Sequence, residues 1–251
     1  MDVRLAASFV LAAAGTLLVG SPALAAPDEP PPMSTNALED LISRPHTIAE
    51  VEAGLIALPG KPISQQQRGG DTPIGRVGRG DATMEVGAHV LYRFQQNYVI
   101  GAGVIFSPFG TTDDTWGGRS NLSRTHKRSY LFLGVEARYV PFRYKSFEGW
   151  FGISGGGVIV ADTFHTDARE VPPILGVPDN TIRTEGGALG LQVGGTYYIS
   201  ENWIAGANLR GYHWILPEGR QCSTIVTDCT TLRGSVEVFE FGLTIGYRLP
   251  L

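Results

Sequence analysis

The 251-residue chain has few cysteines, few charges and no long apolar run beyond its first 25 residues. Because no stretch of about 18 apolar residues follows that point, we expect no transmembrane helix in the remainder. The formal net charge of −4 gives no electrostatic reason to expect nucleic acid as a partner. Only 18% of the residues are charged and 33 are glycine, which is unusual for a soluble helical domain.

The first 25 residues have the three parts of a secretory signal peptide. Arg4 supplies a positive charge, residues 5–20 form an apolar core, and Ala23-Leu24-Ala25 is a small-residue cleavage motif. We therefore expect cleavage after residue 25 and export from the cytoplasm. Residues 26–47 begin APDEPPP and predict a proline-rich periplasmic lead, which leaves residues 48–251 as one folded domain.

The two cysteines lie close together in the segment QCSTIVTDCTT. An exported chain folds in an oxidising compartment, so Cys222 and Cys229 predict a disulfide within one loop. The alternative is a metal-binding pair, but the segment contains no histidine and no further cysteine to complete a site.

Large apolar residues alternate with glycine and polar residues along most of the domain. In ALGLQVGGTYYISENWIAGANLRGYHW (188–214), Leu189, Leu191 and Val193 fall on one face, with Gly190 and Gln192 on the other. The alternation stops at SEN and then resumes, which predicts two strands joined by a tight turn. The same pattern predicts strands at 46–58, 83–94, 98–107, 129–140, 150–161, 188–199, 203–214 and 237–249.

The connections between these eight segments alternate in length. Residues 95–97, 141–149 and 200–202 are the shorter ones, whereas 59–82, 108–128, 162–187 and 217–235 are long and polar. An even strand count with this alternation is typical of outer-membrane barrels, with periplasmic turns and extracellular loops. The sequence therefore predicts an all-β fold, an eight-stranded antiparallel up-and-down transmembrane β-barrel.

Charged residues within the strands share their face with the glycines, and we place that face in the lumen. An eight-stranded barrel is only wide enough for side chains, so we expect a packed interior in which Glu50 and Glu52 lie between Arg93 and Arg248. Arg210 and Glu240 form a second expected pair. The predicted lumen charge network comprises Glu50, Glu52, Glu85, His89, Arg93, Glu136, Arg138, Arg210, Glu240 and Arg248.

Aromatic residues gather at the strand ends, as two interfacial belts would require. The expected belt near the short turns comprises Tyr92, Phe94, Tyr98, Tyr139, Trp150, Tyr197, Trp203 and Tyr247. The expected belt near the long loops comprises Phe106, Tyr130, Phe164, Trp214 and Phe239. A soluble lipocalin-type barrel has the same alternation, but it explains neither the two belts nor the strand lengths.

The chain resembles the small outer-membrane barrels of the OmpA, OmpX and OmpW kind in its signal peptide, eight alternating strands, four long loops and amphipathic last strand. The segments AEVEAGLIALPG and LSRTHKRSYLF also resemble proteins identified only as outer-membrane β-barrel domains. The resemblance implies that the last strand is recognised by the barrel-assembly machinery, although this chain ends Arg-Leu-Pro-Leu and not in an aromatic residue. The residues concerned are Phe239, Phe241, Leu243, Ile245 and Tyr247.

A basic cluster in the second long loop suggests contact with lipopolysaccharide phosphates, which arginine binds bidentately. The alternative is a solvated loop. The cluster comprises Arg119, Arg124, Lys127 and Arg128.

Motifs for metal-dependent catalysis are absent from the sequence. It has no HxH or HExxH motif, and we expect no enzyme activity, no metal and no cofactor. A lipid A-modifying enzyme is the least favoured alternative, and the residues that would have to converge for it are Ser123, His126, His165, Asp167 and His213.

The main functional hypothesis is a non-enzymatic outer-membrane protein that displays four loops for envelope integrity or surface interaction. Its expected partners are outer-membrane lipid, lipopolysaccharide and an envelope or cell-surface protein. The second hypothesis is a narrow or lateral-exit channel for small solutes, including apolar ones, with the paired lumen charges acting as a gate.

Overall fold

The computed structural model describes residues 44–59, 80–116, 123–166, 179–219, 221–223, 229–230 and 232–250. The predicted signal peptide and most of the predicted lead lie outside these residues. No helix in the described part is long and apolar enough to cross a membrane. The strands are β1 (His46–Pro59), β2 (Gly80–Gln95), β3 (Tyr98–Phe106), β4 (Thr111–Trp116), β5 (Ser123–Tyr144), β6 (Phe147–Thr166), β7 (Asn180–Tyr198), β8 (Trp203–Ile215) and β9 (Ser235–Pro250).

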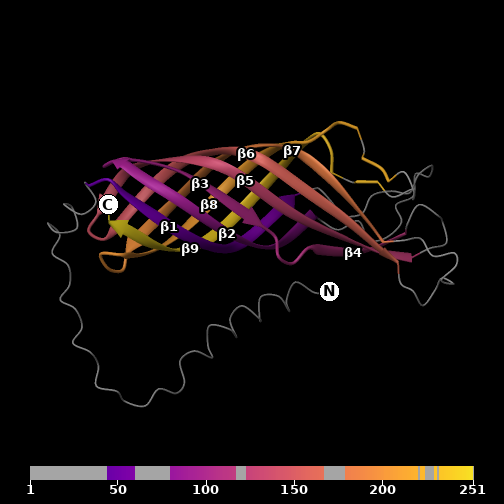
Figure 1. Ribbon diagram of the computed structural model, residues 1–251, viewed down its shortest axis with the longest axis horizontal. Helices are drawn as coiled ribbons and strands as arrows, with labels where there is room; N and C mark the ends of the chain where they lie inside the picture. The colour runs from indigo at the N-terminus through magenta and orange to yellow at the C-terminus, as the bar shows by residue number, and fades with distance from the viewer. Residues whose placement is uncertain are drawn as a thin grey trace, which may run out of the picture. The chain divides into compact units, whose positions relative to one another are not determined.

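The nine strands form one closed antiparallel sheet (Figure 1). It has eight strand positions around the barrel, which we call staves, because two short strands share one position. Closure comes from the pairing of β1 with β9 and of β3 with β5. Strands β3 and β4 make a single stave, since both pair with β5 on either side of an interruption at 107–110. The predicted eight-stranded up-and-down barrel is confirmed. Strand β1 begins at His46, inside the predicted lead.

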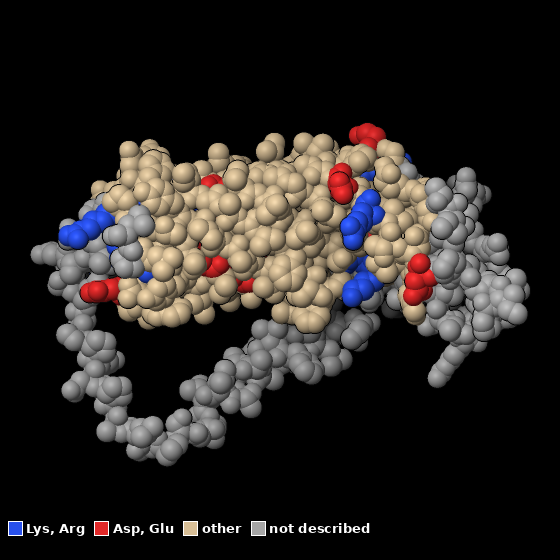
Figure 2. All heavy atoms as spheres, viewed as in Figure 1, with Lys and Arg blue, Asp and Glu red and all other residues tan. Residues whose placement is uncertain are grey.

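Side chains alternate between the outer surface and the interior along the strands whose side chains the structure describes. On β7, for example, Leu191 is 71% exposed whereas the adjacent Gln192 is buried. Few charged side chains interrupt the middle of the outer face, and those in view gather toward its two ends (Figure 2). The middle of the outer face is therefore an aliphatic band. Its exposure to water would be unfavourable, so this surface suits the hydrocarbon core of a bilayer.

Three staves are much longer than the sequence pattern predicted. Strands β5, β6 and β7 run through segments expected to be loops, and β4 lies within the predicted loop 108–128. The alternation of apolar residues did not predict these strand ends, because it depends on apolar residues that face outward. Beyond the aliphatic band the outward-facing residues include polar ones, and Lys127, Arg183 and Glu185 are all exposed there. We call the segments Thr111–Trp116, 123–130, 160–166 and 180–186 the protruding sheet.

The two predicted aromatic belts are only partly correct. Tyr130, Phe164 and Trp214, expected at the loop-side interface, are buried inside the barrel, and so is Trp150 from the turn-side belt. Aromatic character alone did not show whether these residues face the interior or the outer surface. The turn side retains a dense exposed group, which comprises Tyr92, Phe94, Tyr98, Tyr139, Phe142, Tyr144, Phe147, Tyr197, Trp203 and Tyr247.

The interior consists of two apolar layers with charged residues between them. The turn-side apolar layer comprises Ile48, Leu91, Val99, Val140, Trp150, Tyr198 and Ile204. The loop-side apolar layer comprises Ile56, Leu58, Ile105, Tyr130, Phe132, Val158, Val160, Ala188, Tyr212, Trp214, Leu216, Leu232, Val236 and Val238. Strand β1 crosses all three in order, with Ile48 in the first, Glu50 and Glu52 in the middle, and Ile56 and Leu58 in the last.

The connection from β8 to β9 carries the predicted disulfide, which is confirmed. Cys222 and Cys229 are joined, with their Cα atoms 4.1 Å apart. Two buried residues of this connection, Leu216 and Leu232, belong to the loop-side apolar layer. At its base Gly234 has a φ of 62° and accepts a backbone hydrogen bond from Leu216. A side chain at Gly234 would be strained in this left-handed conformation.

Candidate functional site

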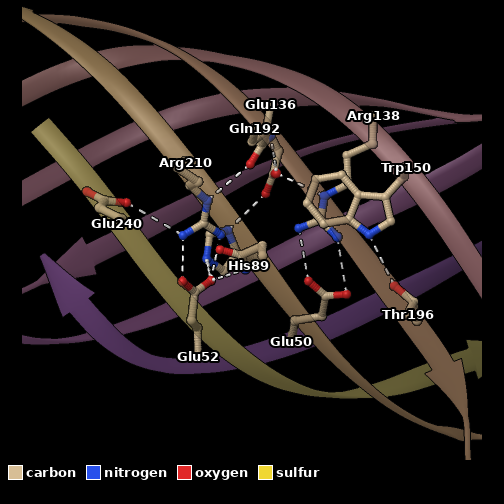
Figure 3. A network of polar contacts seen from close by, with 11 residues as sticks. Glu50, Glu52, His89, Glu136, Arg138, Trp150, Gln192, Thr196, Arg210 and Glu240 are labelled. Carbon is tan, nitrogen blue, oxygen red and sulfur yellow. Dashed lines mark hydrogen bonds and ion pairs between the residues drawn. The ribbon is translucent and has the colours of Figure 1, made fainter.

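All ten residues of the predicted lumen network are buried inside the barrel. Eight of them lie between the two apolar layers, and we call this set the charged layer. Figure 3 labels all of this set except Glu85. Arg93 and Arg248 lie nearer the short turns. The charged layer comprises Glu50, Glu52, Glu85, His89, Glu136, Arg138, Arg210 and Glu240.

The strongest contact in the charged layer joins β1 and β8, which are separated by β9. The two terminal nitrogens of Arg210 lie 2.5 and 2.6 Å from the two carboxylate oxygens of Glu52. Asn208 donates to the same carboxylate, and Arg210 Nε donates to Gln192 Oε1 at 3.0 Å. This bidentate pair satisfies both buried charges.

A second arginine crosses the lumen from β5. Arg138 donates to both carboxylate oxygens of Glu50, at 3.3 and 3.0 Å, and through Nε to Glu136 at 3.0 Å. Its guanidinium carbon also lies 4.3 Å from the centre of the Trp150 ring. The cation thus contacts two carboxylates and an aromatic face of the turn-side apolar layer.

His89 joins the two arginine clusters. Its Nδ1 lies 2.9 Å from Glu136 and its Nε2 lies 3.2 Å from Glu52. Since each ring nitrogen faces a carboxylate, the arrangement suits the imidazolium form, in which both nitrogens carry hydrogen.

The expected placement of Glu50 and Glu52 between Arg93 and Arg248 is wrong. Arg93 binds Glu148 at 2.5 and 3.1 Å, and Arg248 donates to the Glu201 carbonyl oxygen at 3.4 Å. The expectation considered neighbouring strands only, whereas an arginine side chain reaches across so narrow a lumen. Arg210 and Glu240 do face each other on adjacent strands, at 3.7 Å between nitrogen and oxygen.

Glu148, which the sequence pattern did not identify, organises the turn-side end of the lumen. Besides Arg93 it accepts a hydrogen bond from Arg143 at 2.7 Å and one from the Tyr198 hydroxyl at 2.9 Å. It fell in the predicted connection 141–149, yet it has the same phase as Trp150 and could have been found by extending β6 by two residues.

Glycines open the space that the carboxylates occupy. A side chain at Gly242 would collide with the Glu52 carboxylate, and one at Gly54 would come within 2.9 Å of Glu85 Oε1. A cavity of about 10 Å³ beside His89, Glu136 and Arg210 is at the limit of one water molecule.

A further buried cluster lies in the protruding sheet. His126 Nε2 and Arg128 Nε lie 2.7 and 3.0 Å from the same oxygen of Asp162, and the His126 ring stacks on Phe164. Burial by itself raises the pKa of Asp162, but the hydrogen bond from His126 and the charge of Arg128 outweigh it. The net pKa of Asp162 is therefore below its ordinary value.

The predicted lipopolysaccharide cluster does not form as one surface patch. Arg128 is buried against Asp162, whereas Lys127 is exposed. Arg119 and the side chain of Arg124 lie outside the described residues.

The enzyme candidates are not brought together either. His126 faces inward, whereas His165 and His213 are on the outer surface, paired with Asp179 and Glu237. Asp167 and the side chain of Ser123 lie outside the described residues. Within the described chain no group of three His, Cys, Asp or Glu residues could hold a metal ion.

No family model and no curated protein matches the sequence. The chain is similar to several solved structures. Neisserial surface protein A matches 81% of this chain and 97% of its own, at 11% identity and a TM-score of 0.48. OprG from Pseudomonas aeruginosa matches 84% and 99%, at 14% identity and 0.46. The outer membrane protease OmpT from Escherichia coli matches 81% and 97%, at 12% and 0.42. At these identities and TM-scores the likeness carries no conclusion about the function of this chain.

Proposed function

We propose that this chain is a non-enzymatic outer-membrane protein whose packed barrel supports the protruding sheet, and that this sheet contacts a protein on the cell surface. The observation that carries the proposal is the continuation of β5, β6 and β7 beyond the aliphatic band. The cleaved signal peptide and the extracellular placement of the long connections belong to the same proposal.

The edges of the protruding sheet support this role. The ladder between β7 and β8 begins at Gly187, so among the described strands Asn180–Gly186 pairs only with β6. On the opposite side, within the part of the chain that the structure describes, β4 pairs only with β5. A sheet edge with unpaired backbone groups can accept an extended segment of another protein.

The buried cluster around Asp162 supports the rigidity of this sheet. His126 and Arg128 on β5 bind Asp162 on β6, and Phe164 packs on His126. A preformed binding edge loses less conformational entropy on association than a flexible loop would.

Lipid partners follow from the outer surface. The aliphatic band suits membrane lipid, and exposed Lys127 is available to a lipopolysaccharide phosphate. On β9 the exposed residues at alternate positions are those expected to be read by the barrel-assembly machinery. They are Phe239, Phe241, Leu243, Ile245 and Tyr247.

The test is adhesion of bacteria that produce the chain, measured on epithelial cells and on neighbouring bacteria. One variant replaces residues 107–128 and 163–182 by short turns, which removes most of the protruding sheet. A control variant shortens the connection 60–79 instead. We expect the first variant to lose adhesion and the control to retain it, with unchanged surface amounts of both. Equal adhesion by both variants would contradict the proposal.

A further inference from the structure

The charged layer contains more carboxylates than cations. Its carboxylates are Glu50, Glu52, Glu85, Glu136 and Glu240, and its cations are Arg138, Arg210 and, as an imidazolium, His89. All eight side chains are buried, so water cannot screen the difference. A buried excess of negative charge is costly unless a further positive charge or a bound proton compensates it.

Three of the carboxylates account for the three cations. Glu50 binds Arg138, Glu52 binds Arg210, and Glu136 binds His89 at 2.9 Å. The two carboxylates that remain are Glu85 on β2 and Glu240 on β9.

Glu85 is the less compensated of these two. It is 1% exposed, and neither of its carboxylate oxygens has a hydrogen-bond partner in the described part of the barrel. Its charged neighbours are Glu240, Glu52 and Arg210, and the arginine is already bound bidentately to Glu52. Glu240 at least lies 3.7 Å from the same arginine.

The surroundings of Glu85 leave little room for an ion. The carboxylate lies against Gly54 of β1, where even one added carbon would be 2.9 Å from Oε1. The loop-side apolar layer lies directly beyond, beginning with Ile56 and Tyr212. Among the described residues, no group of three His, Cys, Asp or Glu side chains that could hold a metal ion lies here or elsewhere.

We propose that Glu85 and Glu240 form a buried proton-binding site and that Glu85 carries the proton at neutral pH. The proton removes one negative charge from the layer and leaves Glu240 opposite Arg210. It also lets a neutral acid lie against the loop-side apolar layer, where an ionised carboxylate would be costly. Release of the proton at alkaline pH would place three carboxylates, Glu85, Glu240 and Glu52, around the single cation Arg210.

Infrared spectroscopy of the refolded protein in detergent tests this directly. A protonated carboxylic acid has a carbonyl stretch distinct from that of a carboxylate, and the stretch shifts in D2O. We expect this band at pH 7 in the wild type, its loss in Glu85→Gln, and its persistence in Glu237→Gln. Glu237 is the matched control because it is exposed and paired with His213 on the outer surface.

Two spectroscopic results would overturn the proposal. One is the absence of the band from the wild type at pH 7, and the other is its survival in Glu85→Gln. Glutamine closely mimics the neutral acid, so failure of this variant to fold in detergent would also count against the proposal.

A second measurement separates a proton from a metal cation. The unfolded chain exposes Glu85 to water, where it ionises above about pH 4.3. The folded chain then holds an extra proton at neutral pH, so its stability falls as pH rises. We expect the unfolding midpoint to fall more steeply between pH 7 and pH 10 in the wild type than in Glu85→Gln. Stabilisation of the wild type, but not of Glu85→Gln, by added Na⁺, K⁺ or Ca²⁺ would instead identify a metal occupant.

Discussion

At the scale of single residues, the alternation along a strand predicted which side chains are buried in the lumen, but not which residues they pair with. All ten residues assigned to the lumen by alternation are inside, because a strand has only two faces and lipid excludes charge from one of them. Their partners could not be predicted in the same way. Glu52 pairs with Arg210 and Glu50 with Arg138 across the lumen, and such contacts depend on barrel width and stagger.

Removal of Arg210 should be strongly destabilising, because it leaves Glu52 buried without its bidentate partner. We expect Arg210→Met to lower the free energy of unfolding by about 3–5 kcal/mol, measured by urea unfolding in detergent. The control Arg183→Met replaces an exposed arginine and should change little. Equal losses of unfolding free energy in the two variants would show that the buried pair does not stabilise the barrel more than an exposed arginine does.

The space beside Glu52 depends on glycine. A Cβ at Gly242 would overlap the Glu52 carboxylate, so Gly242→Ala should cost about 1–3 kcal/mol of stability through overpacking. Gly211 is a matched control on the neighbouring strand, where a Cβ would be 4.0 Å from the nearest side-chain atom, on Phe239. If Gly211→Ala destabilised the barrel as much in urea unfolding, the argument from space would fail.

Acid should weaken the protruding sheet through Asp162. Its pKa is lowered when folded, because His126 and Arg128 outweigh the effect of burial. A lowered pKa gives stability that is fully present above the ordinary aspartate value of about 3.9 and is lost as pH falls further. Limited proteolysis of β5 and β6 should therefore accelerate below pH 4 in the wild type. In Asp162→Asn the cleavage rate should be higher at neutral pH and change less with acid; a parallel acid response would contradict this assignment.

At the scale of elements, the sequence predicted the number and direction of the staves but not their length. The apolar alternation that marked β5, β6 and β7 ends where they leave the aliphatic band, although backbone pairing continues to Ser123, Thr166 and Asn180. The alternation of apolar residues did not predict the division of one stave into β3 and β4 either. Strand ends outside a membrane carry no burial signal that a period-two reading can detect.

The disulfide should stabilise one connection and leave the barrel intact. Leu216 and Leu232 hold the base of this connection in the loop-side apolar layer without the Cys222–Cys229 bond. We expect Cys222→Ser/Cys229→Ser to keep the shift between boiled and unboiled samples on a gel while losing at most about 2–3 kcal/mol of stability. Loss of the shift would mean that the bond is required for closure.

At the scale of the whole molecule, the interior is organised as three layers. The two apolar layers enclose the charged layer, and ion pairs between β1, β5 and β8 span the lumen. An ion crossing this interior would have to displace the apolar layers as well as the paired charges. The layered packing therefore supports a scaffold rather than the channel considered as the alternative function.

Single-channel recording in planar lipid bilayers tests this central claim most directly. The refolded protein, shown to be closed by its heat-modifiable migration, should add no conductance steps above the lipid background, and Arg138→Met should add none either, because the apolar layers remain. Reproducible steps in the wild type would contradict the account and favour a channel gated by the charged layer.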